Sequence, residues 1–125
     1  MAKKIIWADD NQTFRESMIA SLEEYCSRVK IEVEFDEAAD GKELVKKVLS
    51  SHYDLVFTDN QMTDVHGLQA IAQIREQNKT IPVYMVSSSE VGKRALEVGA
   101  TGYLEKQDYD TFKSGIENVV TTHLK

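Results

Sequence analysis

The chain has 125 residues, of which 42% are hydrophobic and 29% charged, and its formal net charge is −6. This length suits one domain with one hydrophobic core. The acidic balance argues against direct nucleic-acid binding, because phosphate contacts need clustered Lys and Arg. No apolar run approaches the roughly 20 residues of a membrane span, and Asp9-Asp10 ends the first apolar run too early for a secretory signal. We therefore expect a single domain over residues 1–125, located in the cytoplasm, with neither membrane nor nucleic acid as a direct partner.

Short apolar runs alternate along the chain with stretches of helical periodicity. The runs that we expect to form strands are Lys4–Ala8, Ile31–Phe35, Leu55–Thr58, Val83–Val86 and Gly102–Leu104. Apolar residues at the spacing of one helical face predict a helix after each run. The first helix carries Phe14, Met18 and Leu22, the next three cover about Lys42–Ser50, Gly67–Gln77 and Val91–Val98, and the last carries Phe112 and Ile116.

Five strand–helix units in succession predict an α/β fold, with a parallel sheet covered by helices on both faces. The runs Lys4–Ala8, Leu55–Thr58 and Val83–Val86 are apolar throughout, as strands buried on both faces are. Ile31–Phe35 alternates apolar and polar residues and Gly102–Leu104 is short, so both are expected at edges. These features favour a doubly wound five-stranded parallel sheet of strand order 2-1-3-4-5.

This strand order brings several charged residues to one edge of the sheet. Asp9 and Asp10 follow the first strand, Asp59 follows the third and Lys106 follows the fifth. Either acidic segment alone could be a solvated turn or a helix cap, but ligands of such sheets bind beyond the carboxyl ends of the strands, at the switch point between strands one and three. The conjunction of the three acids at that point therefore indicates a site.

Mutual repulsion in such a cluster favours a bound cation. Two carboxylates about 4 Å apart repel by about 4 kcal/mol at an effective dielectric constant of 20. Oxygen ligands with room for water suit Mg²⁺, whereas His52, His66 and His123 are too scattered to suggest zinc. A metal ion, a nucleophilic carboxylate and a lysine suffice for phosphoryl transfer through an aspartyl phosphate.

At these positions the chain resembles the receiver domain of bacterial response regulators, the chemotaxis-regulator-like superfamily, along nearly its whole length. The matching segments are Asp9-Asp10, Phe14-Arg15-Glu16, Asp59-Asn60-Gln61-Met62 with Gly67 eight residues after Asp59, Val83–Ser87 and Gly99–Lys106. The resemblance implies a flavodoxin-like (βα)5 fold.

The resemblance also implies a role for each matching residue. Asp59 would be the phosphoacceptor and Lys106 would contact the phosphoryl group. Ser87 would be the switch hydroxyl and Tyr103 the aromatic switch. Mg²⁺ or Mn²⁺ would be held by Asp9, Asp10, Asp59 and the backbone carbonyl of Gln61.

The function implied is that of a phosphorylation-controlled signalling domain of a two-component system. A histidine kinase or a histidine phosphotransfer protein would supply the phosphoryl group, and the face formed by helix four, strand five and helix five would change shape for an effector that the sequence does not identify. The chain would assist its own phosphorylation and dephosphorylation without turning over an external substrate.

Two other functional classes can be weighed against this one. A phosphorylation-independent pseudo-receiver, which only binds partners, is the alternative; the presence of all the residues of the expected site argues against it. An aspartyl phosphatase would need an acid two residues after its nucleophile, where this chain has Gln61.

Three departures from the family pattern carry expectations of their own. Thr63 and Gln107 stand where prolines are usual. A cis bond without proline costs about 2.5–4 kcal/mol, so we expect a trans Lys106–Gln107 bond. Only 19 residues separate Ser87 from Lys106, about three fewer than the resemblance leads us to expect, which predicts a shortened helix-four region.

Overall fold

The computed structural model describes residues 2–106 and 108–125, in which five strands alternate with five helices. The strands are β1 (Lys3–Ala8), β2 (Val33–Ala38), β3 (Leu55–Asp59), β4 (Val83–Ser87) and β5 (Gly102–Glu105). The helices are α1 (Gln12–Val29), α2 (Gly41–Ser50), α3 (Gly67–Gln77), α4 (Ser89–Glu97) and α5 (Tyr109–Leu124). All strand pairs are parallel and their order is β2-β1-β3-β4-β5, which confirms the predicted topology.

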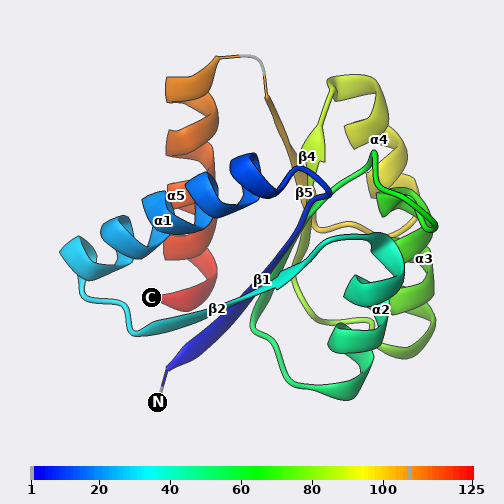
Figure 1. Cartoon of the computed structure of the whole chain (residues 1–125), viewed down its shortest axis with the longest axis horizontal. Coiled ribbons are helices and arrows are strands. Elements are labelled where there is room, and N and C mark those ends of the chain that lie inside the picture. The colour runs from blue at the N-terminus through cyan, green and yellow to red at the C-terminus, as the bar shows by residue number, and fades with distance from the viewer. Residues whose placement is uncertain (1, 107) are drawn as a thin grey trace.

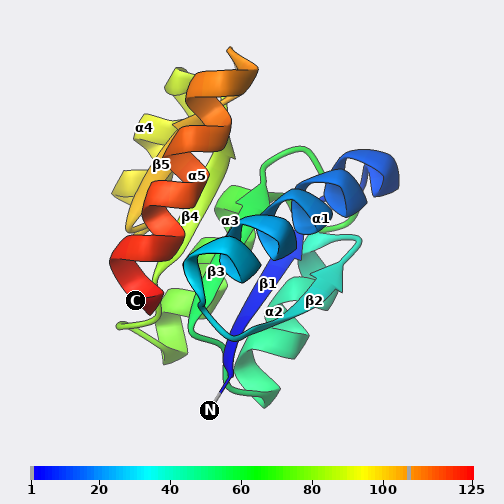
Figure 2. The ribbon, with the colours of Figure 1, turned by 90° about the vertical axis from the view of Figure 1, so that its left-hand side faces the viewer.

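Helices cover both faces of the sheet (Figure 1). One core lies between the sheet and α2, α3 and α4, and the other between the sheet and α1 and α5. Because successive side chains of a strand point to opposite faces, Ile6 and Ala8 of β1 enter the first core, while Ile5 and Trp7 enter the second. Figure 2 shows α1 and α5 on the same face of the sheet, where the hydroxyls of Tyr25 and Thr121 are 2.6 Å apart.

The predicted position of the second strand was wrong. Ile31 belongs to the turn that ends α1, where Lys30 adopts a left-handed conformation and the Ile31 N–H donates to the carbonyl of Cys26. The strand instead continues through the acidic residues Asp36 and Glu37.

The acidic end of β2 is tolerated in the sheet because its charges are paired. Asp36 accepts hydrogen bonds from the Tyr53 hydroxyl and from the Lys47 ammonium, and Glu37 accepts one from Arg15. These partners lie far from β2 in the sequence, so the strand pattern alone did not reveal them.

The other element boundaries differ from the predicted ones by two residues or fewer where bounds were predicted. The connection from β4 to α4 consists of Ser88 alone, and α4 has nine residues, in line with the expected short region. The peptide bond between Lys106 and Gln107, which we expected to be trans, lies outside the described residues. No helix in the described part of the chain combines the length and hydrophobicity needed to cross a membrane.

Candidate functional site

Three carboxylates converge at the carboxyl edge of the sheet. Asp9 and Asp10 follow β1, and Asp59 is the last residue of β3. One oxygen from each lies within 4.8 Å of the others. Asp9 is buried, Asp59 is half-buried and Asp10 is exposed. The cluster is therefore closed to solvent at Asp9 and open to solvent at Asp10. The structure thus brings together the three acids that the sequence pattern singled out.

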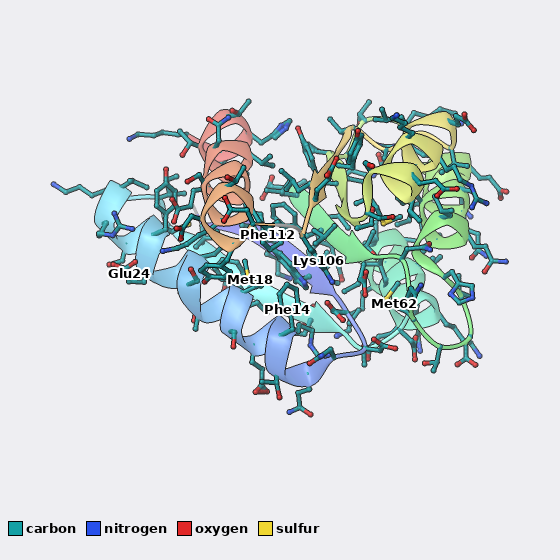
Figure 3. The ribbon with its side chains drawn as sticks, turned by 90° about the horizontal axis from the view of Figure 1, so that it is seen from above. Phe14, Met18, Glu24, Met62, Lys106 and Phe112 are labelled. Atoms are coloured by element: carbon teal, nitrogen blue, oxygen red, sulfur yellow. The ribbon has the colours of Figure 1, made fainter. Side chains whose placement is uncertain are left out.

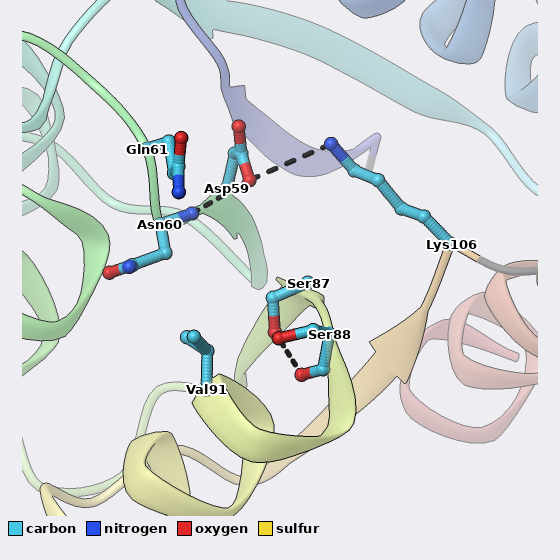
Figure 4. Close-up of a pocket in the computed structure, with 7 residues that line it drawn as sticks. All are labelled: Asp59, Asn60, Gln61, Ser87, Ser88, Val91 and Lys106. Carbon is cyan, nitrogen blue, oxygen red and sulfur yellow. Dashed lines mark hydrogen bonds and ion pairs between the residues drawn. The ribbon is translucent and has the colours of Figure 1, made fainter.

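The ammonium of Lys106 reaches the same point from the end of β5. Its Nζ atom lies 3.6 Å from Oδ1 of Asp59 (Figure 4). The same atom lies 3.8 Å from Oδ2 of Asp9. It also lies over the ring of Phe14, 4.5 Å from the ring centroid. A cation therefore sits beside the carboxylates, at ion-pair distances that exceed those of a hydrogen bond.

Burial and crowding disfavour the charge on Asp9. Burial raises the pKa of Asp9 above its ordinary value and the nearby Asp59 carboxylate adds to the rise, although the Asn11 N–H and the Lys106 ammonium oppose it. Oδ1 of Asp9 accepts the Asn11 N–H at 2.9 Å, whereas its buried Oδ2 has no hydrogen-bond partner among the described residues.

The donor set fits a hard divalent cation. All three side chains offer oxygen, which Mg²⁺ prefers, and Mg²⁺ keeps several waters when bound; the exposed Asp10 leaves room for these. The buried Oδ2 of Asp9, which lacks a hydrogen-bond donor among the described residues, could serve as a ligand to such a cation, and the positive charge would offset the repulsion among the carboxylates.

Arg15 holds the turn that carries Asp9. Its guanidinium is buried and donates from Nη1 to the backbone carbonyl of Asp9 at 2.5 Å and from Nε to Glu37 at 2.7 Å. Helix α1 is thereby tied to the end of β1 and to β2. No role was predicted for Arg15 from the sequence. Its place on the buried face of α1, with Met18 and Leu22, was a signal, because an arginine there needs buried partners.

Gly67 allows α3 to begin against the end of β3. A Cβ atom on Gly67 would lie 2.3 Å from the carbonyl oxygen of Asp59, too close for any side chain. The Gly67 N–H donates to the carbonyl of Asn60, and the side chain of Asn60 accepts the N–H of Leu68. The Asn60 N–H in turn donates to Oδ1 of Asp59 at 2.8 Å. These hydrogen bonds fix the backbone around Asp59 and thereby the position of its side chain.

A pocket of about 420 Å³ lies between Asp59 and the start of α4. Asp59 and Lys106 lie on one side, and Ser87, Ser88 and Val91 on the other (Figure 4). Ser87 is the buried last residue of β4, and its hydroxyl donates to the carbonyl of Ser88 at 2.9 Å.

Two further predicted residues border this region. The exposed Gln61 lines the same pocket. Tyr103 of β5 is half-buried, and its ring lies against α4, where a Cβ atom on Gly92 would be 2.2 Å from it. Gly92 was not singled out from the sequence, since a glycine inside a helix gives no sign of which ring it accommodates.

Comparison with known proteins agrees with this fold and shows the family of the chain. Residues 5–116 match the family described as the response regulator receiver domain, and the chain belongs to this family. Receiver domains are signalling modules of two-component systems that work with histidine kinases, and they are not ordinary enzymes.

Among curated proteins, the chain is 33% identical to the sensor protein EvgS of Escherichia coli O157:H7 over 85 residues, which are 68% of this chain and 7% of EvgS. It is 32% identical to the response regulator ArlR of Staphylococcus saprophyticus over 106 residues, which are 82% of this chain and 45% of ArlR. The chain thus spans less than half the length of these relatives.

Two solved structures are similar over nearly the whole chain. The chemotaxis response regulator CheY4 of Vibrio cholerae is 27% identical, with a TM-score of 0.77 and coverage of 95% of this chain and 99% of CheY4. The response regulator TrrA of Thermotoga maritima, solved in complex with Mg²⁺–BeF, is 28% identical, with a TM-score of 0.78 and coverage of 94% of this chain and 98% of TrrA.

Proposed function

We propose that residues 1–125 form one cytoplasmic receiver domain of a two-component system, in which Asp59 accepts a phosphoryl group from a phosphohistidine. The observation that carries the proposal is the convergence of oxygens from Asp9, Asp10 and Asp59 within 4.8 Å, with the Lys106 ammonium 3.6 Å from Asp59. A carboxylate nucleophile, a metal-binding acidic cluster and a lysine together are the parts that phosphoryl transfer to an aspartate needs.

The metal site in this proposal is the acidic cluster. Asp9, Asp10, Asp59 and the backbone carbonyl of Gln61 would hold Mg²⁺ or Mn²⁺, which when bound neutralises charge on the phosphoryl oxygens. The similar response regulator TrrA, solved in complex with Mg²⁺–BeF, supports this choice.

Asp59 and Lys106 have different roles in the transfer. An oxygen of Asp59 attacks phosphorus, the P–N bond to the donor histidine breaks, and the imidazole leaves with the electron pair. Lys106 neutralises a second phosphoryl oxygen. Attack of water on the aspartyl phosphate later returns Asp59 to the carboxylate and releases inorganic phosphate.

The switch would pass through Ser87 and Tyr103. Ser87 lines the pocket, and among the described residues its hydroxyl bonds to the neighbouring carbonyl of Ser88, so it could exchange that partner for a phosphoryl oxygen. Tyr103 lies against α4, and a movement of the β4–α4 connection would change its environment. The surface formed by α4, β5 and α5 would thereby shift between two populations.

The donor in this proposal is a histidine kinase or a histidine phosphotransfer protein. The effector that binds the switched surface is not assigned, because the matched region covers only 7% of EvgS and 45% of ArlR.

The test is to incubate the protein with Mg²⁺ and acetyl phosphate and to map the adduct by mass spectrometry. We expect one phosphoryl group on Asp59, its loss when Mg²⁺ is chelated, and no adduct in Asp59→Asn. Absence of any adduct on the wild-type protein would overturn the proposal and favour the phosphorylation-independent interaction module.

A further inference from the structure

We propose that Phe14 is a positioning residue for phosphoryl transfer, whose ring holds the Lys106 ammonium beside Asp59. The inference rests on the proposed function of the Asp59 site and adds a residue to it.

The Lys106 ammonium has little else to direct it. Lys106 follows the last residue of β5, and a lysine head lies on a flexible four-carbon stem. Its distances of 3.6 Å to Asp59 and 3.8 Å to Asp9 are too long for directed hydrogen bonds. The face of the Phe14 ring lies 4.5 Å from Nζ, well inside the reach of about 6 Å for a cation–π contact. The contact with the ring thus restricts the position of the ammonium, which the long ion pairs alone do not.

The Phe14 ring is itself held on two sides. It stacks on Phe112 of α5, with centroids 6.2 Å apart and planes 22° apart, and it meets Trp7 of β1 edge to face at 6.4 Å. Trp7 is fully buried and stacks on Phe57 of β3 at 4.8 Å. Figure 3 shows Phe14, Lys106 and Phe112 gathered between α1 and α5. A ring braced by both strands and helix is a fixed surface for a mobile ammonium.

One turn of the backbone links this ring to the carboxylates. The side chain of Asn11 caps α1 by accepting the N–H of Phe14 at 3.0 Å, and the N–H of Asn11 donates to Oδ1 of Asp9 at 2.9 Å. Asn11 therefore links the Phe14 ring to Asp9, which is a proposed metal ligand. Because the ring contacts the Lys106 ammonium, this link also fixes the ammonium relative to the carboxylates.

An aliphatic side chain at position 14 would fill the space without attracting the ammonium, because only an aromatic face offers a negative quadrupole. We expect Phe14→Leu to slow phosphorylation of Asp59 by acetyl phosphate by about two- to fivefold, the size expected of an exposed cation–π contact. Phe14→Tyr keeps the aromatic face and should restore the rate to near the wild-type value.

The experiment measures the rate of adduct formation at saturating Mg²⁺ in the wild type, Phe14→Leu and Phe14→Tyr, each with Lys106 present or replaced in Lys106→Met. The proposal requires that Phe14→Leu slows the reaction when Lys106 is present and has no effect when it is absent. Urea unfolding checks that each variant is folded, and Phe14→Met replaces Phe14→Leu if the latter is not.

The measured rates distinguish a positioning role of Phe14 from a purely structural one. An equal slowing with and without Lys106 means that the ring only supports the fold and overturns the proposal, as does a Phe14→Leu rate equal to the wild-type rate. If the wild-type protein itself forms no adduct on Asp59, the proposed function fails and this inference fails with it, a result distinct from the other two.

Discussion

At the scale of single residues, the candidate site depends on polar groups that are buried and on what each of them contacts. Oδ2 of Asp9 has no hydrogen-bond partner among the described residues and lies 3.8 Å from the Lys106 ammonium, while the backbone carbonyl of Asp9 accepts a hydrogen bond from the guanidinium of Arg15. The same guanidinium is paired with Glu37. A buried charge with two good partners is stable only as long as both remain, because desolvation of a lone group is costly.

Replacing Arg15 tests this dependence. In Arg15→Met the carbonyl of Asp9 loses its donor while the apolar stem is kept, and we expect the free energy of unfolding to fall by about 1–3 kcal/mol. The fluorescence of Trp7, the single tryptophan, which is fully buried, reports urea unfolding. Glu37→Gln is the matched control: it keeps the bond from Arg15 to Asp9 and leaves an amide oxygen that can still accept from Arg15, so the loss should be smaller. A loss as large as that of Arg15→Met would contradict our assignment.

At the scale of elements, the contact between α4 and β5 depends on a missing side chain. The ring of Tyr103 occupies the place where a Cβ of Gly92 would lie. Gly92 is inside α4, where glycine normally costs about 1 kcal/mol relative to alanine. The close approach of strand and helix is thus obtained at the expense of helix propensity.

A double-mutant cycle separates these two effects. With Tyr103 in place, Gly92→Ala should destabilise the protein, because a Cβ 2.2 Å from the ring forces the ring or the helix to move. In a Tyr103→Ala background the same change should stabilise it, by up to about 1 kcal/mol. Urea unfolding of the four proteins measures both terms; the same sign in both backgrounds would show that the ring does not constrain position 92.

At the scale of the whole molecule, stability and metal binding are linked through the acidic cluster. The chain carries a formal net charge of −6, and three of its carboxylates meet within 4.8 Å. Any ligand that binds only the folded state raises the free energy of unfolding, by about 2.7 kcal/mol at a concentration of 100 Kd. Mg²⁺ should therefore act as a stabiliser of the fold as well as a cofactor for transfer.

The exposed Asp10 offers a way to test this linkage. We expect Asp10→Asn to be more stable than the wild type in the absence of Mg²⁺, because one repelling charge is removed, and to gain less from added Mg²⁺, because one ligand is lost. Urea unfolding with a chelator and with Mg²⁺ measures both, and NaCl at equal ionic strength controls for screening. A full Mg²⁺ gain in Asp10→Asn would exclude Asp10 from the metal site.

The secondary-structure elements and the strand order could be predicted from local patterns in the sequence. The alternation of apolar runs and helical stretches predicted ten elements and the strand order, because burial on one or two faces leaves a period in the sequence. The meeting of Asp9, Asp10 and Asp59 followed from that order, since parallel strands end at the same edge.

The tertiary structure decided what depends on partners distant in the chain. The position of β2 is set by pairs such as Tyr53 with Asp36, and no period in the sequence records them. Phe14 and Lys106 likewise come together only because the start of α1 and the end of β5 both lie at the carboxyl edge of the sheet. Burial of one face of a helix or strand imposes a short-range period of apolar residues, which is visible in the sequence. A contact between distant segments exists only once the chain has folded. Its geometry depends on all the elements between those segments.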